Sequence, residues 1–296
     1  MNRRAAVPPH SGNRIVRMGT TARPFGVRRV GGCLFVMACL AALPASAQAC
    51  RLDRIGAGKV GEILDGRTFR LDDGREVRLA AIESPAIPRD GESDLRAAAG
   101  LAAKAALDAL LRGRQVELRR LGPESDRYGR IVAHVSVDAA GRGGGDSNPV
   151  QEALLGQGLV RVAARVDDKA CAAGLLALED NARKAKLGLW ADPHHLPKQA
   201  GNPAELLAEI GRFAVVEGKV LSVRESGGTI YMNFGQRWTR DFAVTISKRQ
   251  ERQFVAAGLE PKKLEGRYVR VRGWIEERGG PRVEAARPEQ IEVVGR

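Results

Sequence analysis

The stretch Asp126-Arg127-Tyr128-Gly129-Arg130 is a polar turn between two segments, Gln115–Arg120 and 131–137, in which apolar and polar residues alternate. Alternation with a period of two is typical of a half-buried β-strand. The same pattern occurs upstream in three further segments, 59–64, 68–71 and 76–82. Strand patterns separated by turn signals predict a small, mainly β domain around this turn.

Helical patterns accompany these strands. Segment 94–111 has an apolar stripe and is followed by Gly113, a residue typical of helix ends. Segments 150–157 and 172–186 are also predicted to be helical. The predicted fold class is therefore mainly β of the α+β type, with strands in the majority.

Several short motifs share one order and spacing with a known family. They are Asp65-Gly66-Arg67-Thr68-Phe69, Val77-Arg78-Leu79-Ala80-Ala81-Ile82-Glu83-Ser84-Pro85, Asp126-Arg127-Tyr128-Gly129-Arg130, Val150-Gln151-Glu152-Ala153-Leu154, Gly158-Leu159-Val160 and Gly188-Leu189-Trp190. The stretch 59–190 that carries them resembles the staphylococcal nuclease, or thermonuclease, family. This resemblance implies an OB-type five-stranded barrel with three helices.

The resemblance also implies a chemistry. Nucleases of this family cleave DNA and RNA phosphodiesters with one calcium ion, two arginines and a carboxylate proposed as general base. A cation and guanidinium groups stabilise the charge that develops on phosphorus, and the base orients or deprotonates water. Arg78 and Arg130 match the two catalytic arginines, and both suit bidentate phosphate contacts.

The sequence departs from the family at two positions. Arg67 stands where the family has its leading calcium-ligand aspartate, and Ala86 follows Pro85 where the family has the general-base glutamate. Glu83 matches a second acidic ligand, and Asp65 remains as an outer carboxylate. An arginine at a cation site repels calcium, and a missing base costs about 10²–10⁴ in rate. We therefore expect no cofactor, and a pocket of Arg67, Arg78 and Arg130 that binds phosphate or nucleic acid with little or no cleavage.

Two alternatives stay open at this point. A metal-dependent phosphodiesterase would hold calcium through Glu83 and Asp65, with a base drawn from elsewhere, for example Glu92 or Asp94. In the other alternative Arg67 pairs with Glu83 or Asp65, the pocket is a relic, and the protein acts as a protein-interaction scaffold.

The carboxy-terminal part has a different charge balance. Residues 207–296 carry a net charge of +5, against +1 for residues 50–206. Three strand patterns, a short helix and two more strands are the order of a second OB-fold-like barrel. Because basic OB folds bind nucleic acid through cations and stacking aromatics, candidate contacts are Trp238, Arg237, Arg240, Arg270 and Arg272. The alternative is that aromatics fill the core and the charged residues form a solvated face.

The domain organisation follows from these patterns. We expect a signal peptide at 1–49, a thermonuclease-like domain at 50–192, a linker at 193–206 and the second barrel at 207–296. The linker contains three prolines and the pair His194-His195, which we expect to be solvated.

The amino-terminal segment is typical of a secretory signal. Residues 1–49 contain seven arginines and no lysine or acidic residue, so they account for about half of the net charge of +13. A 14-residue apolar run at 30–43 precedes the cleavage motifs Ala45-Ser46-Ala47 and Ala47-Gln48-Ala49. Translation from Met18 would retain this run. It is shorter than the roughly 20 residues that span a bilayer, so we expect an exported, periplasmic or secreted protein with no membrane insertion after signal removal.

Composition and cysteines agree with this expectation. A chain of 296 residues with 44% hydrophobic and 28% charged residues is typical of folded proteins, which excludes wholesale disorder. Outside the signal only Cys50 and Cys171 remain. In an oxidising compartment such a pair predicts a disulfide.

Overall fold

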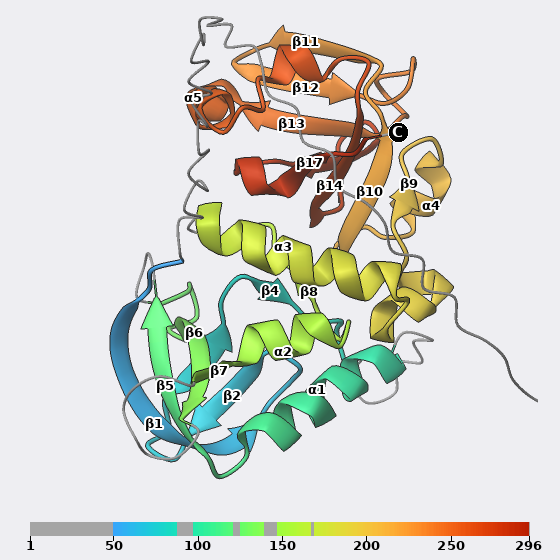
Figure 1. Cartoon of the computed structure of the whole chain (residues 1–296). Coiled ribbons are helices and arrows are strands. Elements are labelled where there is room, and N and C mark those ends of the chain that lie inside the picture. The colour runs from blue at the N-terminus through green and yellow to red at the C-terminus, as the bar shows by residue number, and fades with distance from the viewer. Residues whose placement is uncertain (1–49, 88–96, 121–124, 139–146, 167–168, 296) are drawn as a thin grey trace, which may run out of the picture. The chain divides into compact units, whose positions relative to one another are not determined.

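Five strands form the first barrel, which is shown in Figure 1. The computed structural model describes residues 50–87, 97–120, 125–138, 147–166 and 169–295. The barrel strands are β1 (Asp53–Ile63), β2 (Thr68–Leu71), β3 (Glu76–Leu79), β5 (Gln115–Arg120) and β6 (Ile131–Asp138). Strand β1 pairs with both β2 and β5, β2 pairs with β3, β5 pairs with β6, and a parallel β3–β6 pairing closes the ring. The predicted five-stranded OB-type barrel is confirmed.

The alternation seen in the sequence sorts side chains between the barrel core and its outside. Phe69, Val77, Leu79, Leu118 and Val135 are buried in the core of this barrel. Arg78 is only partly buried because it lies between Val77 and Leu79 and so projects from the other face of β3. Strand periodicity thus places an arginine on the outside of a closed barrel.

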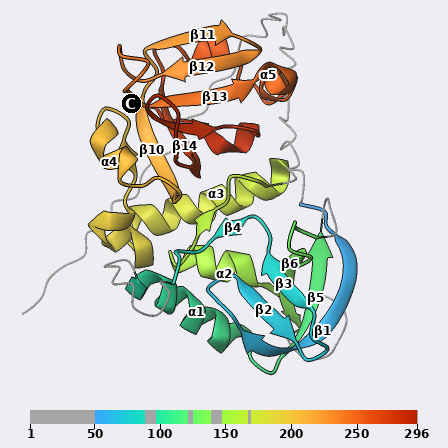
Figure 2. The same cartoon turned by 180° about the vertical axis from the view of Figure 1, so that it is seen from behind.

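Helices and short strands complete this half of the chain. They are β4 (Ile82–Glu83), α1 (Ala97–Leu111), β7 (Ser147–Pro149), α2 (Val150–Gly156), β8 (Arg161–Val162) and α3 (Lys169–Lys184). Figures 1 and 2 show α2 between α1 and α3. The buried amide of Gln151 in α2 accepts a hydrogen bond from Val135 N and donates to Ala133 O. This amide fixes α2 to strand β6.

Two glycines explain one of the sequence motifs. Gly158 and Gly188 both have positive φ, 69° and 50°, a conformation that favours glycine. Leu189 N donates to Gly158 O at 2.8 Å. A Cβ on Gly188 would lie 2.5 Å from Gly158 O. The close backbone approach requires glycine at both positions and ties the end of the first domain to the turn after α2.

Residues 193–206, expected to be a linker, contain short regular elements. They contain the short 3-10 helix η2 (Pro193–His195), β9 (Lys198–Gln199) and the start of α4 (Pro203–Leu207). Strand β9 joins the second barrel because it pairs with β10. His195 is 4% exposed, so only His194 of the expected solvated pair lies at the surface. The carbonyl of His195 accepts a hydrogen bond from Arg161, which also donates to Phe213 O at the start of β10.

The second barrel is formed by two sheets that run into one another. Its elements are β10 (Phe213–Lys219), β11 (Ser222–Ser226), β12 (Thr229–Asn233), β13 (Ala243–Ser247), η3 (Lys248–Gln250), α5 (Glu251–Ala256), η4 (Pro261–Leu264), β14 (Tyr268–Trp274), β15 (Glu276–Glu277), β16 (Pro281–Glu284), η5 (Pro288–Gln290) and β17 (Ile291–Val293). Strand β11 continues β10 after two residues, and β15 continues β14 after one.

Both barrels have the same strand order. In the second, β10–β11 pairs with β12 and with β14, β12 pairs with β13, β13 pairs in parallel with β16, and β16 pairs with β15. The parallel pair β13–β16 therefore corresponds to β3–β6. Helix α5 follows β13 in the chain, as α1 follows β3 and β4. This arrangement confirms the second OB-fold-like barrel.

The predicted disulfide is present. Cys50 precedes β1 and is bonded to Cys171 in α3, 121 residues away, with a Cα–Cα distance of 4.6 Å. This bond attaches the start of the first barrel to the helix that packs beside it. Within the described ranges, no helix combines the length and the apolar character needed to cross a membrane.

Candidate functional site

Neighbouring strands of the first barrel bring the predicted arginines together. Arg67 lies immediately before β2, Arg78 is in β3, and Arg130 lies immediately before β6. Thr68 is paired with Arg78, and Arg78 with Val132. The parallel pairing of β3 with β6 is therefore what carries Arg130 to Arg78 across about fifty residues of sequence.

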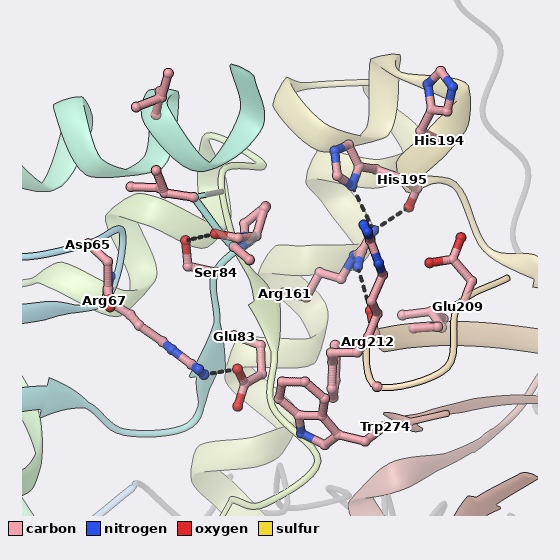
Figure 3. Close-up of a pocket in the computed structure, with 18 of the residues that line it drawn as sticks. Asp65, Arg67, Glu83, Ser84, Arg161, His194, His195, Glu209, Arg212 and Trp274 are labelled. Carbon is pink, nitrogen blue, oxygen red and sulfur yellow. Dashed lines mark hydrogen bonds and ion pairs between the residues drawn. The ribbon is translucent and has the colours of Figure 1, made fainter. Parts of the chain in front are cut away.

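Glu83 is the acidic centre of this group. Its carboxylate is nine-tenths buried, because β4 places it against β8. One oxygen, Oε1, accepts from Arg78 Nη2 at 2.9 Å. The other, Oε2, forms an ion pair with Arg67 Nη1, as Figure 3 shows. Both carboxylate oxygens of Glu83 thus have guanidinium partners.

Asp65 acts on the backbone at this site. Its Oδ1 accepts a hydrogen bond from Arg67 N at 2.8 Å, a contact two residues along the chain. This contact is an Asx-type turn, in which a short acidic side chain bonds the backbone two residues on. The turn fixes the direction from which Arg67 leaves the barrel.

Asp126 organises the Asp-Arg-Tyr-Gly-Arg turn, a role that the sequence analysis did not assign. Its Oδ2 accepts from Arg130 Nε at 2.8 Å and from Arg130 Nη2 at 2.7 Å. Its Oδ1 accepts from the backbone N–H groups of Tyr128 and Arg130. Gly129 adopts a φ of 76° at the tip. The motif is thus a turn stabilised by its own hydrogen bonds, which hold the Arg130 guanidinium. The four-residue spacing of Asp126 and Arg130 is the feature of the sequence that could have predicted this contact.

Burial and like charge act on the arginines. Burial, followed by repulsion from Arg78, lowers the pKa of Arg67 to about 10. Burial and then repulsion from Arg130 also lower the pKa of Arg78. Arg67 and Arg78 remain cationic at neutral pH, but neighbouring positive charges make this an environment that an additional anion stabilises.

Opposite effects compete at Asp126. Burial opposes ionisation of this carboxyl, yet the hydrogen bonds from Arg130 and from the backbone outweigh it and lower the pKa of Asp126 below its ordinary value. The carboxylate is therefore the stable form at neutral pH, where it keeps Arg130 in place.

An exposed aromatic ring borders the arginines. Tyr128 is 66% exposed. The guanidinium carbon of Arg127 lies 4.8 Å from its ring centroid, and that of Arg130 lies 5.2 Å away. These are cation–π distances. The sequence motif contains Tyr128 but does not indicate a role for it, because its contact with Arg130 depends on the conformation of the turn.

The position expected to lack a general base is an exposed alanine. Ala86 follows Pro85 after β4, and its methyl group cannot accept a proton. Glu92 and Asp94, the suggested replacements, lie outside the described residues. Among the residues that the structure describes, no three His, Cys, Asp or Glu side chains gather as metal ligands would.

A cavity of about 730 Å³ extends from the Arg67–Glu83 pair toward the second barrel (Figure 3). Its first-barrel wall includes Asp65, Arg67, Glu83 and Lys104. Its other walls come from β8, from residues 194–198 and from the second barrel. Arg161 of β8 crosses between these walls, donating to Phe213 O at 3.1 Å and to His195 O at 2.7 Å.

Two arginines of the second barrel do not serve as predicted. Arg272 is 1% exposed and donates to Glu179 Oε2 at 2.6 Å and to Val162 O at 3.2 Å. Arg270 bonds Glu217 Oε1 at 2.7 Å and has little exposure. The prediction that they contact nucleic acid is wrong, because both are neutralised inside the fold. Trp238, Arg237 and Arg240 lie in the exposed turn after β12, where Trp238 is 77% exposed, so their role stays a prediction.

The comparisons agree with this geometry. Residues 76–192 match the family model described as staphylococcal nuclease homologue. The chain is also 32% identical over 142 residues to Protein ParB of Escherichia coli, a match that covers 46% of this chain and 73% of ParB. The matched region contains Arg78, Glu83 and Arg130, and the first barrel has the nuclease-like, nucleic-acid-binding fold of this family. The chain therefore belongs to the staphylococcal nuclease homologue family.

Proposed function

We propose that this protein binds the phosphodiester backbone of nucleic acid at Arg78 and Arg130 and does not cleave it with calcium. One observation carries the proposal: Arg78 and Arg130 stay partly exposed while the guanidinium of Arg67 is paired with the Glu83 carboxylate, a pair that the relic alternative also contains. That pair occupies an acidic ligand that the family uses for calcium, while the two arginines of the phosphate clamp remain partly exposed.

Calcium does not fit these residues. It takes six to eight oxygen ligands, with carboxylates prominent among them. Both oxygens of Glu83 are engaged by Arg67 and Arg78. A unit positive charge 4 Å from another costs about 4 kcal/mol at an effective dielectric of 20, and calcium carries two. A metal would therefore have to displace Arg67 from the site.

A phosphate suits the same residues. A guanidinium has five N–H donors in a planar fork that matches phosphate oxygens. Arg130 donates to Asp126 through its Nε and Nη2 groups. Those contacts orient the guanidinium, and the like charges of Arg67 and Arg78 favour an anion beside it. We therefore infer that Arg78 and Arg130 contact phosphate while Asp126 stays in place.

Export is part of the proposal. The Cys50–Cys171 disulfide supports it, since disulfides persist in oxidising compartments such as the periplasm and the extracellular space. The arginine-rich and apolar segments of residues 1–49 are consistent with this location, and they lie outside the described residues.

The test uses purified protein and labelled single-stranded DNA, with calcium or with a chelator. We expect intact DNA in both conditions and salt-sensitive binding that is the same in both. Arg130→Ala should weaken binding at least about 10-fold, the effect of losing a charged hydrogen bond. Arg112→Ala is the matched control, because Arg112 follows α1, has an exposed side chain and pairs with Asp108.

Two results would contradict the proposal in different ways. Cleavage that requires calcium and Arg130 would establish an active phosphodiesterase with an altered ligand set. Absence of binding at low salt would favour a protein-interaction scaffold whose arginine group is a relic.

A further inference from the structure

Among the residues that line the 730 Å³ cavity, Trp274 has a large exposed aromatic surface. It is the last residue of β14 and is 45% exposed. In the β10–β14 ladder it is directly paired with Phe213, and the two rings meet edge to face at 6.1 Å and 73°. This contact packs the indole against Phe213, while part of the Trp274 surface stays exposed at the cavity.

The cavity joins this aromatic surface to one member of the arginine group, Arg67, whose partner Glu83 is also bonded to Arg78. Arg67 and Glu83 line one side, and Trp274 lines another. Figure 3 shows the indole of Trp274 extending from the second barrel toward the side on which Glu83 lies. Lys104 of α1 adds positive charge to the wall, whereas Lys198 of β9 is ion-paired with Glu205 and Glu209. A volume of this size is in the range of pockets that hold a nucleotide-sized ligand.

We propose that the second barrel supplies a base-binding subsite, in which Trp274 stacks on an unpaired base of the strand whose phosphate lies at Arg78 and Arg130. This inference rests on the proposed function and deepens it, because it names single-stranded nucleic acid as the ligand. A base held in a duplex already stacks on its neighbours, so only an unpaired base is available to an aromatic side chain in a cavity.

Single-stranded binding by stacking has a measurable signature. Base–aromatic stacking is sequence-tolerant, and its loss on alanine substitution corresponds to roughly 5- to 150-fold in affinity per base. Stacking on Trp274 requires the base and not the phosphate. The arginine contacts require the phosphate and not the base. The two contributions can therefore be separated by a strand that has phosphates but no bases.

The experiment measures the affinity of the full chain for three labelled probes of equal length: a single strand, an abasic single strand and a duplex. Trp274→Ala should weaken binding of the base-containing strand about 5- to 150-fold and leave binding of the abasic strand unchanged. Trp274→Phe should retain most of the affinity, because a ring remains. Arg130→Ala should weaken binding of both strands.

Each other outcome overturns a defined claim. If Trp274→Ala and Trp274→Phe both bind the base-containing strand as the unchanged protein does, there is no base subsite at Trp274. If Trp238→Ala causes the base-dependent loss instead, stacking occurs on the exposed turn after β12. Equal losses on both strands in both Trp274 variants also reject stacking. If Arg130→Ala leaves the affinity for the abasic strand unchanged, the phosphate clamp itself is wrong.

Discussion

Three arginines of the first barrel and Arg272 of the second lie in or beside strands of similar sequence pattern, but their electrostatic environments are opposite. Arg67, Arg78 and Arg130 lie side by side at a partly exposed face of the first barrel. Arg272 lies fully buried in the second barrel, between the carboxylates of Glu179 and Glu292. Burial alone lowers an arginine pKa in both places. At Arg67 burial prevails, whereas at Arg272 the two carboxylates outweigh it and raise the pKa.

The charged neighbours of a guanidinium therefore distinguish an arginine that binds a ligand from one that stabilises the fold. A structural arginine is surrounded by acceptors and is stabilised as it stands. A binding arginine shares its acceptors with other cations, so an added anion improves its surroundings. By this criterion Arg272 is structural. The group at Arg78 and Arg130 is suited to a ligand.

The largest expected effect is a loss of stability when Arg272, the structural arginine, loses a partner. Glu179→Gln removes the buried partner of Arg272 and should lower the free energy of unfolding by up to about 3–5 kcal/mol, because the fully buried guanidinium keeps only the partly exposed Glu292. Chemical denaturation measures this loss. Glu276→Gln, which removes an exposed partner of Arg282, is the control and should change stability by less than about 1 kcal/mol. Similar values for the two variants would mean that Arg272 is not the structural anchor described.

The next largest effect concerns DNA cleavage, which we expect Arg67 to prevent. The double substitution Arg67→Asp with Ala86→Glu restores a carboxylate at each position where the chain departs from its family. We expect calcium-dependent cleavage of DNA at least about 10²-fold above that of the unchanged protein. Arg67→Ala with Ala86→Glu is the control, since it removes the positive charge without adding a ligand. Equal cleavage by both variants would show that repulsion by Arg67, and not the missing ligand, limits activity.

Part of this picture could be predicted from the sequence. The family resemblance of the motifs implied the first barrel and identified Arg78, Arg130 and the departure at Arg67, and the order of strand and helix patterns indicated the second barrel. The outcome at Arg272 could not be predicted, because Arg270-Val271-Arg272 has the pattern of any half-exposed strand. Its partner Glu179 lies 93 residues away in α3. The surroundings of His195 likewise include a distant residue, Arg161, which donates to its carbonyl, and local composition does not indicate this contact.

The salt dependence of binding distinguishes arginines that contact phosphate from arginines that do not. Each phosphate contact contributes about 0.7 to the slope of log affinity against log salt for a single strand. Arg78→Ala and Arg130→Ala should each reduce the slope by about that amount. Arg112→Ala should leave it unchanged. Unchanged slopes in the first two variants would show that neither arginine contacts phosphate. The measurement is a series of affinities between low and moderate salt.

The smallest effect is a pH dependence at Asp126. Its pKa is lower in the folded protein than its ordinary value, so its contribution to stability is complete above the ordinary pKa and is lost as pH falls through the folded value. Asp126→Asn should therefore be less stable than the unchanged protein at neutral pH, and the difference should shrink in acid. Thermal unfolding across this range measures it. A difference that is constant with pH would exclude ionisation of Asp126 as its cause.

The most direct test of the central claim is a calorimetric titration of calcium into the purified protein. If the Arg67–Glu83 pair has replaced the metal, the unchanged protein gives no saturable calcium binding in the millimolar range, while Arg67→Asp with Ala86→Glu does. Saturable binding by the unchanged protein, abolished by Glu83→Gln, would contradict the account, because Glu83 would then be a calcium ligand despite Arg67.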